Sequence, residues 1–307
     1  MAADLVIGVE GGATRTTGVL VEGGLQVIAE HVAGPSNVHA VGEAGALAAV
    51  TEVVSGLRQE AGDRWREVRG SAFCMAGLRA EADRAVWRRI VTEAGAPGPV
   101  HLTHDAVASL AAGSPDVTGV LVISGTGSIV YGRAEDGREH RVGGRGPVLG
   151  DEGSGFDIGR LALRAAASAA DSRGPATALG HLIPARLGLA GLDDLIAWVS
   201  PFAKDRIASV APIVFEAAAG GDDVAEGIIR TAAGELARGV EAVIARLWPG
   251  RDREGPTCAV LSGGVLRAQA GFRQMLTAMI ADVTRGAEIV LPEISGAVGA
   301  ARIARLA

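Results

Sequence analysis

The sequence predicts an α/β protein made of two similarly built domains, in each of which helices cover a mixed sheet. Strand-like apolar runs alternate with helical runs along most of the chain, a pattern typical of such sheets. A strand, a glycine-rich turn and a second strand occur near the N-terminus and again near the middle of the chain. The 307 residues suffice for about two domains of ~150 residues each.

The first half of the chain begins with a hairpin. LVIGVE, residues 5–10, predicts a strand, GGATRT predicts a turn, and TGVLVE, residues 17–22, predicts the returning strand. Apolar residues at helical spacing predict a helix over about 43–61. The other elements expected here are a strand in GLQVIAEHVAG, a buried strand in VRGSAFCMAGL, an amphipathic helix in EADRAVWRRIVTEAG, and a strand followed by a helix in PVHLTHDAVASLAAG.

The second half repeats this plan. VTGVLVISGTGSIVYGRAEDG, residues 117–137, again predicts a strand, a glycine turn and a strand, followed by an acidic turn. A glycine-rich stretch, residues 143–155, precedes a mostly helical region that runs to about Leu247. The remaining expected elements are a strand in TCAVLSGG, a helix in FRQMLTAMIADVTRG, a strand in EIVLP and a final helix from about Ser295.

Charge and cysteine content exclude several classes of protein. The net charge is −6 and no basic stripe with interleaved aromatics is present, so we expect no nucleic-acid partner. The only two cysteines, Cys74 and Cys258, are far apart, which argues against a disulfide framework and against a CxxC-type zinc site. The start MAADLVIGVEGG lacks the features of a signal peptide, and no apolar run reaches the ~20 residues of a bilayer span. We therefore expect a cytoplasmic protein with no membrane contact.

The tips of the two hairpins consist of glycine and hydroxyl residues with little bulk. Each tip taken alone could be an ordinary tight turn, since glycine supplies the backbone angles that turns need. Backbone N–H groups in such a turn also form an anion-binding concavity, and Thr14 and Thr126 add a hydroxyl at each tip. Two tips of this kind in one chain favour a site that holds a polyphosphate.

The common nucleotide-binding motifs are absent from the sequence. The single lysine, Lys204, lies in SPFAKDRIAS and belongs to no GxxxxGK[ST] loop or protein-kinase signature. GRGPVLG does not have the GxGxxG spacing of a dinucleotide fold, and no GxSxG nucleophile elbow occurs. The two glycine hairpins are therefore the remaining candidates for phosphate binding.

Several polar residues have a structural interpretation beside a functional one. Asp105, at a strand-to-helix junction, can cap a helix or act as a general base. Asp151 and Glu152 can form a solvated acidic turn or bind hydroxyl groups. Asn37 follows Pro35–Ser36 as a turn residue would, and Glu10 could be an ordinary charge at the end of a strand.

Five segments together resemble a known family. IGVEGGATRT, THDAVASL, LVISGTGS, VGGRGPVLGDEGSG and LSGGVL occur in the order seen in actin-like sugar kinases. The chain more narrowly resembles the N-acetylglucosamine kinase branch, also called the BadF/BadG/BcrA/BcrD ATPase family. The resemblance implies two actin-like, ribonuclease H-like lobes with the active site in the cleft between them. The small lobe would comprise residues 1–113 and the C-terminal helix 294–307, and the large lobe residues 114–293. It also implies a homodimer.

The resemblance implies ATP and Mg²⁺ as cofactors. Glu10 would hold Mg²⁺ through water, although most actin-like kinases have Asp there; Mg²⁺ usually keeps several waters, so a longer side chain is acceptable. The residues expected to bind ATP are Glu10, Gly11, Gly12 and Thr14 in the first hairpin, Gly125, Thr126, Gly127 and Ser128 in the second, and Ala208, Gly263 and Gly264 around the adenosine.

The resemblance further implies transfer of phosphate from ATP to the 6-hydroxyl of an amino sugar, with N-acetylglucosamine as the first choice. Asp105 would be the catalytic base. The residues expected to bind the sugar are Asn37, Asp105, Gly144, Arg145, Gly146, Asp151 and Glu152. Arg145 stands where the animal enzymes have Trp, and Val38–His39 replaces their His-Trp, so glucosamine and N-acetylmuramic acid remain alternative substrates.

Two other functional classes remain open from the sequence. Some relatives are ATPase activators of 2-hydroxyacyl-CoA dehydratases, which need cysteine ligands for an iron–sulfur cluster. The large lobe offers only Cys258, within a strand-like run, which disfavours that function. A non-catalytic sugar sensor is the other class, and the absence of a helix-turn-helix ahead of VIGVEGG disfavours direct DNA binding.

Overall fold

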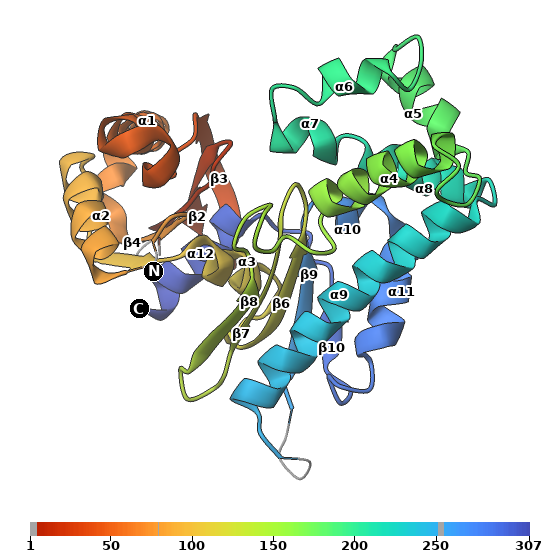
Figure 1. Ribbon diagram of the computed structural model, residues 1–307. Helices are drawn as coiled ribbons and strands as arrows, with labels where there is room; N and C mark the ends of the chain where they lie inside the picture. The colour runs from red at the N-terminus through yellow and green to blue at the C-terminus, as the bar shows by residue number, and fades with distance from the viewer. Residues whose placement is uncertain (1–4, 79, 251–254) are drawn as a thin grey trace. The chain divides into compact units, whose positions relative to one another are not determined.

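The computed structural model describes residues 5–78, 80–250 and 255–307 (Figure 1). Residues 1–4, on which the signal-peptide expectation partly rests, lie outside the described residues. The chain divides into two compact units, with breaks between Thr118 and Gly119 and between Leu291 and Pro292. Unit 1 combines the N-terminal part of the chain with its C-terminal helix, and unit 2 is the continuous segment between them.

Unit 1 contains a five-stranded mixed sheet with the order β3-β2-β1-β4-β5. β1 and β2 form an antiparallel hairpin, β3 pairs antiparallel with β2, and β4 and β5 add parallel strands on the other side of β1. The central strand β1 is almost wholly buried, as its apolar sequence LVIGVEG predicts. The strands are β1 (Leu5–Gly11), β2 (Thr16–Glu22), β3 (Gln26–Ala33), β4 (Val68–Met75) and β5 (Val100–Thr103).

Helices pack on both faces of the unit 1 sheet. α1 (Val38–Ala61), the 3₁₀ turn η1 (Gly62–Glu67) and α2 (Glu81–Glu93) belong to one apolar cluster. α3 (Asp105–Gly113) and α12 (Gly296–Leu306) pack against each other and against β1. α12 approaches β1 so closely that a Cβ atom at Gly8 would overlap its backbone. This close approach brings the start of α12 next to the end of β1.

Unit 2 repeats the sheet of unit 1 with the order β10-β9-β6-β7-β8. β6, β7 and β8 are antiparallel neighbours, and β9 and β10 continue the sheet as parallel strands beside β6. Read from its antiparallel edge, this sheet has the same strand order and directions as the sheet of unit 1. The strands are β6 (Gly119–Ser124), β7 (Ser128–Arg133), β8 (Glu139–Gly143), β9 (Cys258–Ser262) and β10 (Glu288–Val290).

The helices of unit 2 share one large apolar core with the strands. The longest, α9, lies along β7 and β8 and packs against α8 and α11 (Figure 1). The helices are α4 (Gly155–Ala170), α5 (Leu179–Leu187), α6 (Asp194–Trp198), α7 (Lys204–Ala208), α8 (Ala211–Ala219), α9 (Asp223–Leu247), α10 (Gly264–Ala268) and α11 (Ala270–Ile280).

The predicted α/β class and the repeated hairpin plan are confirmed by the two matching mixed sheets. β8 was not predicted, because its residues, EHRVG, are mostly polar and only partly buried. η1 and α10 were not predicted either, and each is about one or two turns long. The helix expected from residue 43 begins earlier, at Val38, and has a kink at Gly42, where φ is +73°.

One helical segment among the described residues, Val38–Glu67, is long and apolar enough to cross a membrane by length and composition alone. Buried core helices pass the same test. The apolar side of α1, including Val50, Val53 and Leu57, is buried in the core of unit 1. The segment is therefore weak evidence for a membrane span.

Candidate functional site

The tip of the β1–β2 hairpin is a tight, exposed turn. The Gly12 N–H donates to the Arg15 carbonyl at 2.9 Å, which closes the turn. The Gly12 carbonyl accepts from the N–H groups of Ser36 and Asn37 at 3.1 and 3.3 Å. Thr14 lies at the exposed tip. The hairpin is thus fixed at its base by the loop before α1, while its tip is open to a ligand.

Two carboxylates share one cavity in unit 1. The cavity has a volume of about 180 Å³ and is lined by Glu10, the hairpin tip, Thr17 and Asp105. Burial and the nearby charge of Asp105 raise the pKa of Glu10 from 4.5 to about 7. Ser109 Oγ lies 3.4 Å from Glu10 Oε1 and partly offsets this rise by donating a hydrogen bond. The cavity therefore disfavours two negative charges unless a cation accompanies them.

The start of α12 also borders the Glu10 carboxylate. A Cβ atom at Gly296 would lie 2.5 Å from Glu10 Oε2, closer than carbon and oxygen can approach. Glycine at this position therefore leaves the space that the carboxylate occupies. No sequence pattern revealed this requirement, because residues 10 and 296 are brought together only by the packing of α12 on β1.

Asp105 is the first residue of α3, immediately after β5. The N-cap position is held by His104, so Asp105 itself is not the N-cap. Asp105 Oδ1 accepts a hydrogen bond from the N–H of Ala106 at 3.0 Å. The carboxyl ends of the parallel strands β1, β4 and β5 lie along one edge of the sheet, which explains how Glu10 and Asp105 meet.

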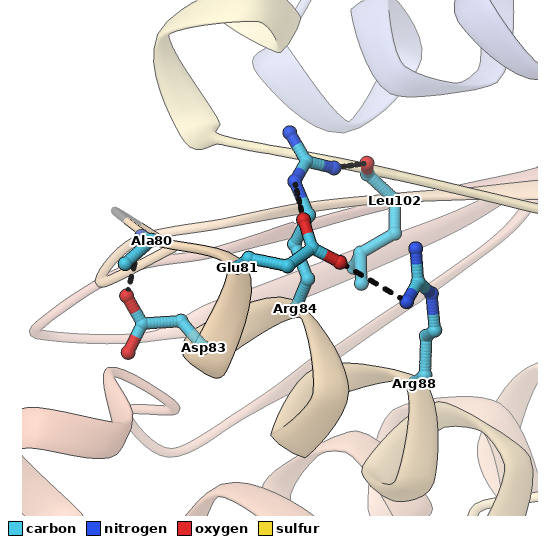
Figure 2. A network of polar contacts seen from close by, with 6 residues as sticks. All are labelled: Ala80, Glu81, Asp83, Arg84, Arg88 and Leu102. Carbon is cyan, nitrogen blue, oxygen red and sulfur yellow. Dashed lines mark hydrogen bonds and ion pairs between the residues drawn. The ribbon is translucent and has the colours of Figure 1, made fainter.

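A polar network at the start of α2 fixes β5 just before Asp105 (Figure 2). Arg84 Nη1 donates to the carbonyl of Leu102 at 3.0 Å. The Glu81 carboxylate lies between Arg84 and Arg88. Its Oε2 is 3.7 Å from Arg84 Nε, and its Oε1 is 3.3 Å from Arg88 Nη1. The exposed ion pairs contribute little free energy. The Arg84 bond, however, ties α2 to β5 three residues before Asp105.

The same part of α2 supports the loop that carries Asn37. Asp83 Oδ1 lies 3.4 Å from His39 Nε2, which also contacts the Gly77 carbonyl at 3.0 Å. Asn37 caps α1, with its Oδ1 accepting from the N–H of His39 at 3.1 Å. Asn37 is therefore the N-cap of α1 rather than the turn residue considered from the sequence, and its sugar-binding role stays a prediction.

In unit 2 the end of β6 and the GTGS turn after it are joined to the GDEGSG loop by four hydrogen bonds. The Gly125 N–H donates to the Gly127 carbonyl at 2.9 Å and closes the β6–β7 turn. The four linking bonds are Ser124 Oγ to Gly153 O at 2.7 Å, Ser128 Oγ to Glu152 O at 2.7 Å, Gly155 N–H to Gly125 O at 2.8 Å, and Ser128 N–H to Asp151 Oδ1 at 3.3 Å. The two motifs thus form one rigid polar structure.

Asp151 is buried and its carboxylate has partners on both oxygens. The residue is only 3% exposed and has a left-handed backbone, with φ at +63°. Its Oδ1 accepts from the Ser128 N–H, and its Oδ2 forms an ion pair with Lys204 Nζ at 2.6 Å. In the described structure Asp151 therefore holds together the hairpin, its own loop and α7, which sequence analysis did not foresee.

The second hairpin also borders a cavity in unit 2 with a volume of about 380 Å³. Its walls include Gly125, Thr126, Ala208 and Gly264, four residues predicted to bind ATP, together with Asp205. Gly263, the residue before Gly264, has φ at +95°, and a Cβ atom there would lie 2.8 Å from Ser124 N, so that any side chain would overlap the backbone of β6. Residues from three separate segments of the sequence thus meet at one cavity.

The other predicted sugar residues lie elsewhere around this loop. Gly144 and Gly146 both have left-handed backbones, with φ at +64° and +86°, and Arg145 between them is exposed. Glu152 lines a separate cavity of about 180 Å³ with Ser128 and residues of α9. Within unit 2 the structure therefore groups the predicted nucleotide residues more closely than the predicted sugar residues.

Comparison with known proteins decides the family. The family model described as "BadF/BadG/BcrA/BcrD ATPase family" matches residues 7–304. The chain belongs to the BadF/BadG/BcrA/BcrD ATPase family. It is 33% identical over 99% of its length to an N-acetyl-D-glucosamine kinase of Dictyostelium discoideum, of which it covers 98%. It is 36% identical over 78% of its length to an N-acetylmuramic acid/N-acetylglucosamine kinase of Clostridium acetobutylicum, of which it covers 79%.

Solved structures support the fold of this family member. A candidate N-acetylglucosamine kinase from Chromobacterium violaceum has a TM-score of 0.72 at 24% identity, with 98% of each chain covered. A ROK family glucokinase from Streptomyces griseus, solved with glucose and AMPPNP, has a TM-score of 0.56 at 17% identity, with 99% of this chain and 100% of that chain covered. At these identities the likeness concerns the fold, and it confirms the predicted actin-like class.

Neither cysteine of this ATPase family member is an exposed thiol. Cys74 lies in β4 beside Glu10, and burial raises its pKa well above the ordinary value. Cys258 lies buried in β9, and burial and Glu288 raise its pKa to about 11. Both thiols are therefore poor nucleophiles at neutral pH.

Proposed function

We propose that this chain is an ATP-dependent amino-sugar kinase that phosphorylates the 6-hydroxyl of N-acetylglucosamine. Family membership and relatives that match the chain at 33–36% identity support this proposal. The observation that carries it is the cavity of about 380 Å³ where the tip of the β6–β7 hairpin meets Ala208 and Gly264. A cavity bordered on one side by a glycine hairpin suits a nucleotide whose phosphates run along the hairpin.

Unit 2 would supply the nucleotide site. The cavity wall near Phe215 and Pro212 is apolar and suits the adenine base, whereas Gly125 and Thr126 offer backbone N–H groups and a hydroxyl. The absence of a side chain at residue 125 lets phosphate oxygens approach the backbone. Gly263, next to the wall residue Gly264, packs closely against Ser124 of β6.

Unit 1 would supply the catalytic base and the metal carboxylate. Asp105 accepts the proton of the attacking sugar hydroxyl, which makes the oxygen a better nucleophile. The described residues contain no group of three or more His, Cys, Asp or Glu side chains placed to hold a metal. Mg²⁺ commonly uses one or two carboxylates together with waters and substrate phosphates, so Glu10 beside Asp105 fits that role. When bound, Mg²⁺ would neutralise phosphate charge.

The names of the two relatives support the choice among amino sugars. The Dictyostelium relative is an N-acetyl-D-glucosamine kinase, and the Clostridium relative acts on N-acetylmuramic acid as well. N-acetylmuramic acid is therefore the second candidate substrate. The exposed Arg145 supports this alternative, because a guanidinium could pair with the lactyl carboxylate that distinguishes this sugar from N-acetylglucosamine.

A coupled assay of ADP release tests the proposed function. The purified protein is supplied with Mg-ATP and, in parallel, with N-acetylglucosamine, N-acetylmuramic acid, glucosamine or glucose. We expect sugar-dependent turnover with at least one N-acetylated sugar and at least a hundredfold lower kcat/KM with glucose. ADP release at the same rate with and without every sugar, from folded protein that binds ATP, would contradict the proposal.

A further inference from the structure

The side chain of the single lysine in the chain, Lys204, lies against the tip of the β6–β7 hairpin. Lys204 begins α7, and its Nζ is 2.6 Å from Asp151 Oδ2. The same ammonium lies against Gly127, where a Cβ atom would be 2.7 Å from Nζ and 2.9 Å from Asp151 Oδ1. Glycine at position 127 therefore leaves the space in which the ion pair sits.

The ion pair joins an anchored carboxylate to a cation that still reaches solvent. Asp151 is held by the Ser128 N–H and has a side chain only 4% exposed. The Lys204 side chain is 30% exposed, so it is open to solvent on one side. In such an arrangement the buried carboxylate holds the ammonium in a fixed position. The ammonium is then already placed to bind an anion.

The position of α7 connects this cation with the large cavity of unit 2. Asp205 and Ala208 of α7 line the cavity, as do Gly125 and Thr126 of the hairpin. Gly127, the next residue of the hairpin, lies against the Lys204 ammonium. A ligand that extends from the cavity along the hairpin tip would therefore come to Lys204.

We propose that Lys204 binds the terminal phosphates of the nucleotide, with Asp151 positioning its ammonium. This assignment rests on the proposed nucleotide function of the same cavity. Three backbone or side-chain observations support it: the approach of Nζ to Gly127, the anchoring of Asp151, and the lining of the cavity by α7. Each added phosphate brings negative charge to the hairpin tip, where a lysine acts as a point charge.

Calorimetric titration with adenosine, ADP and ATP at constant Mg²⁺ tests the proposal. We expect Lys204→Met to weaken ATP binding by about ten- to a hundredfold, which corresponds to the loss of a charge-assisted contact. Adenosine binding should stay within about twofold of wild type. Lys204→Arg, which keeps the charge, should recover most of the ATP affinity.

Arg206→Met is the matched control, since it removes one positive charge from the same helix. The Arg206 guanidinium donates to the Trp198 carbonyl at 2.8 Å and lies 5.8 Å from the Trp198 ring centre. We expect this variant to bind all three ligands like wild type. This result would show that loss of net charge alone does not explain the effect of Lys204→Met.

The outcomes separate the two proposals. Equal loss of adenosine and ATP affinity in Lys204→Met, or no loss at all, would overturn the phosphate-binding role and leave a structural ion pair. Thermal unfolding of each variant would then show whether the pair only stabilises the loop. If wild-type protein binds ATP no better than adenosine, the nucleotide function itself fails, and the Lys204 assignment fails with it.

Discussion

Glu10 provides a direct thermodynamic test of the carboxylate cavity in unit 1. Its pKa is raised from 4.5 to about 7, first by burial and then by the charge of Asp105. In the folded protein Glu10 thus holds its proton more tightly than in the unfolded chain. This contribution to stability is fully present below pH 4.5 and is lost as the pH rises through 7.

The magnitude follows from the two pKa values. A tenfold change in proton affinity corresponds to 1.36 kcal/mol, so the difference between 4.5 and 7 amounts to about 3 kcal/mol. Because the cavity is open to water, we expect the measured value to be nearer 2 kcal/mol. Glu10→Gln cannot ionise and should therefore be more stable than wild type by about 2 kcal/mol at pH 8, with little difference at pH 4.5.

Urea unfolding measures this difference. Wild type and Glu10→Gln are unfolded at pH 4.5, 6 and 8 in buffer containing a metal chelator, and unfolding is followed by the fluorescence of the four tryptophans, of which Trp87 is buried in unit 1. Glu93→Gln is the control, because Glu93 is an exposed carboxylate at the end of α2 in the same unit. A Glu10→Gln effect that is independent of pH, or that destabilises the protein at pH 8, would refute the reasoning.

Three further substitutions test the geometry. Gly296→Ala places a methyl group 2.5 Å from Glu10 Oε2. We expect the free energy of unfolding, measured by heat or urea, to fall by about 1–3 kcal/mol and kcat to fall at least tenfold. Wild-type stability and kcat would contradict the contact. Asn37→Ala removes the cap of α1 and should cost about 1 kcal/mol. It should also raise the KM for sugar but not for ATP, and equal changes in both would argue against sugar binding. Gly263→Ala forces a side chain against Ser124 at φ +95°, and should cost about 3 kcal/mol or more and abolish ATP binding in calorimetry.

The strands and the two hairpins could be predicted because their signal is local. LVIGVE, TGVLVE and VLVISGTGSIVYG are apolar runs that contain glycine, and β1, β2, β6 and β7 follow these runs closely. β8 could not be predicted in the same way. It is a polar strand at the edge of the sheet. Its conformation comes from pairing with β7 and not from a pattern in its own sequence.

The hairpin part of the site could be predicted from the sequence, because residues 10–14 are consecutive. The approach of Asp105 to Glu10 depends instead on the parallel order of β1, β4 and β5, and the predicted roles rested on family resemblance. Lys204 was not predicted as a site residue, because the role proposed for it depends on its contact with Asp151, which lies 53 positions earlier in the sequence. Its only signal was that no other lysine occurs in the chain.

The most direct test of the account is to identify the product of the reaction. Protein, Mg-ATP and N-acetylglucosamine are incubated, and the sugar product is examined by phosphorus–proton correlation NMR, for wild type and for Asp105→Asn. We expect one sugar phosphate, with phosphorus coupled to the two protons on carbon 6, and at least a hundredfold slower formation in Asp105→Asn. Phosphate on another hydroxyl, only free phosphate, or an unchanged rate in the variant would contradict this expectation.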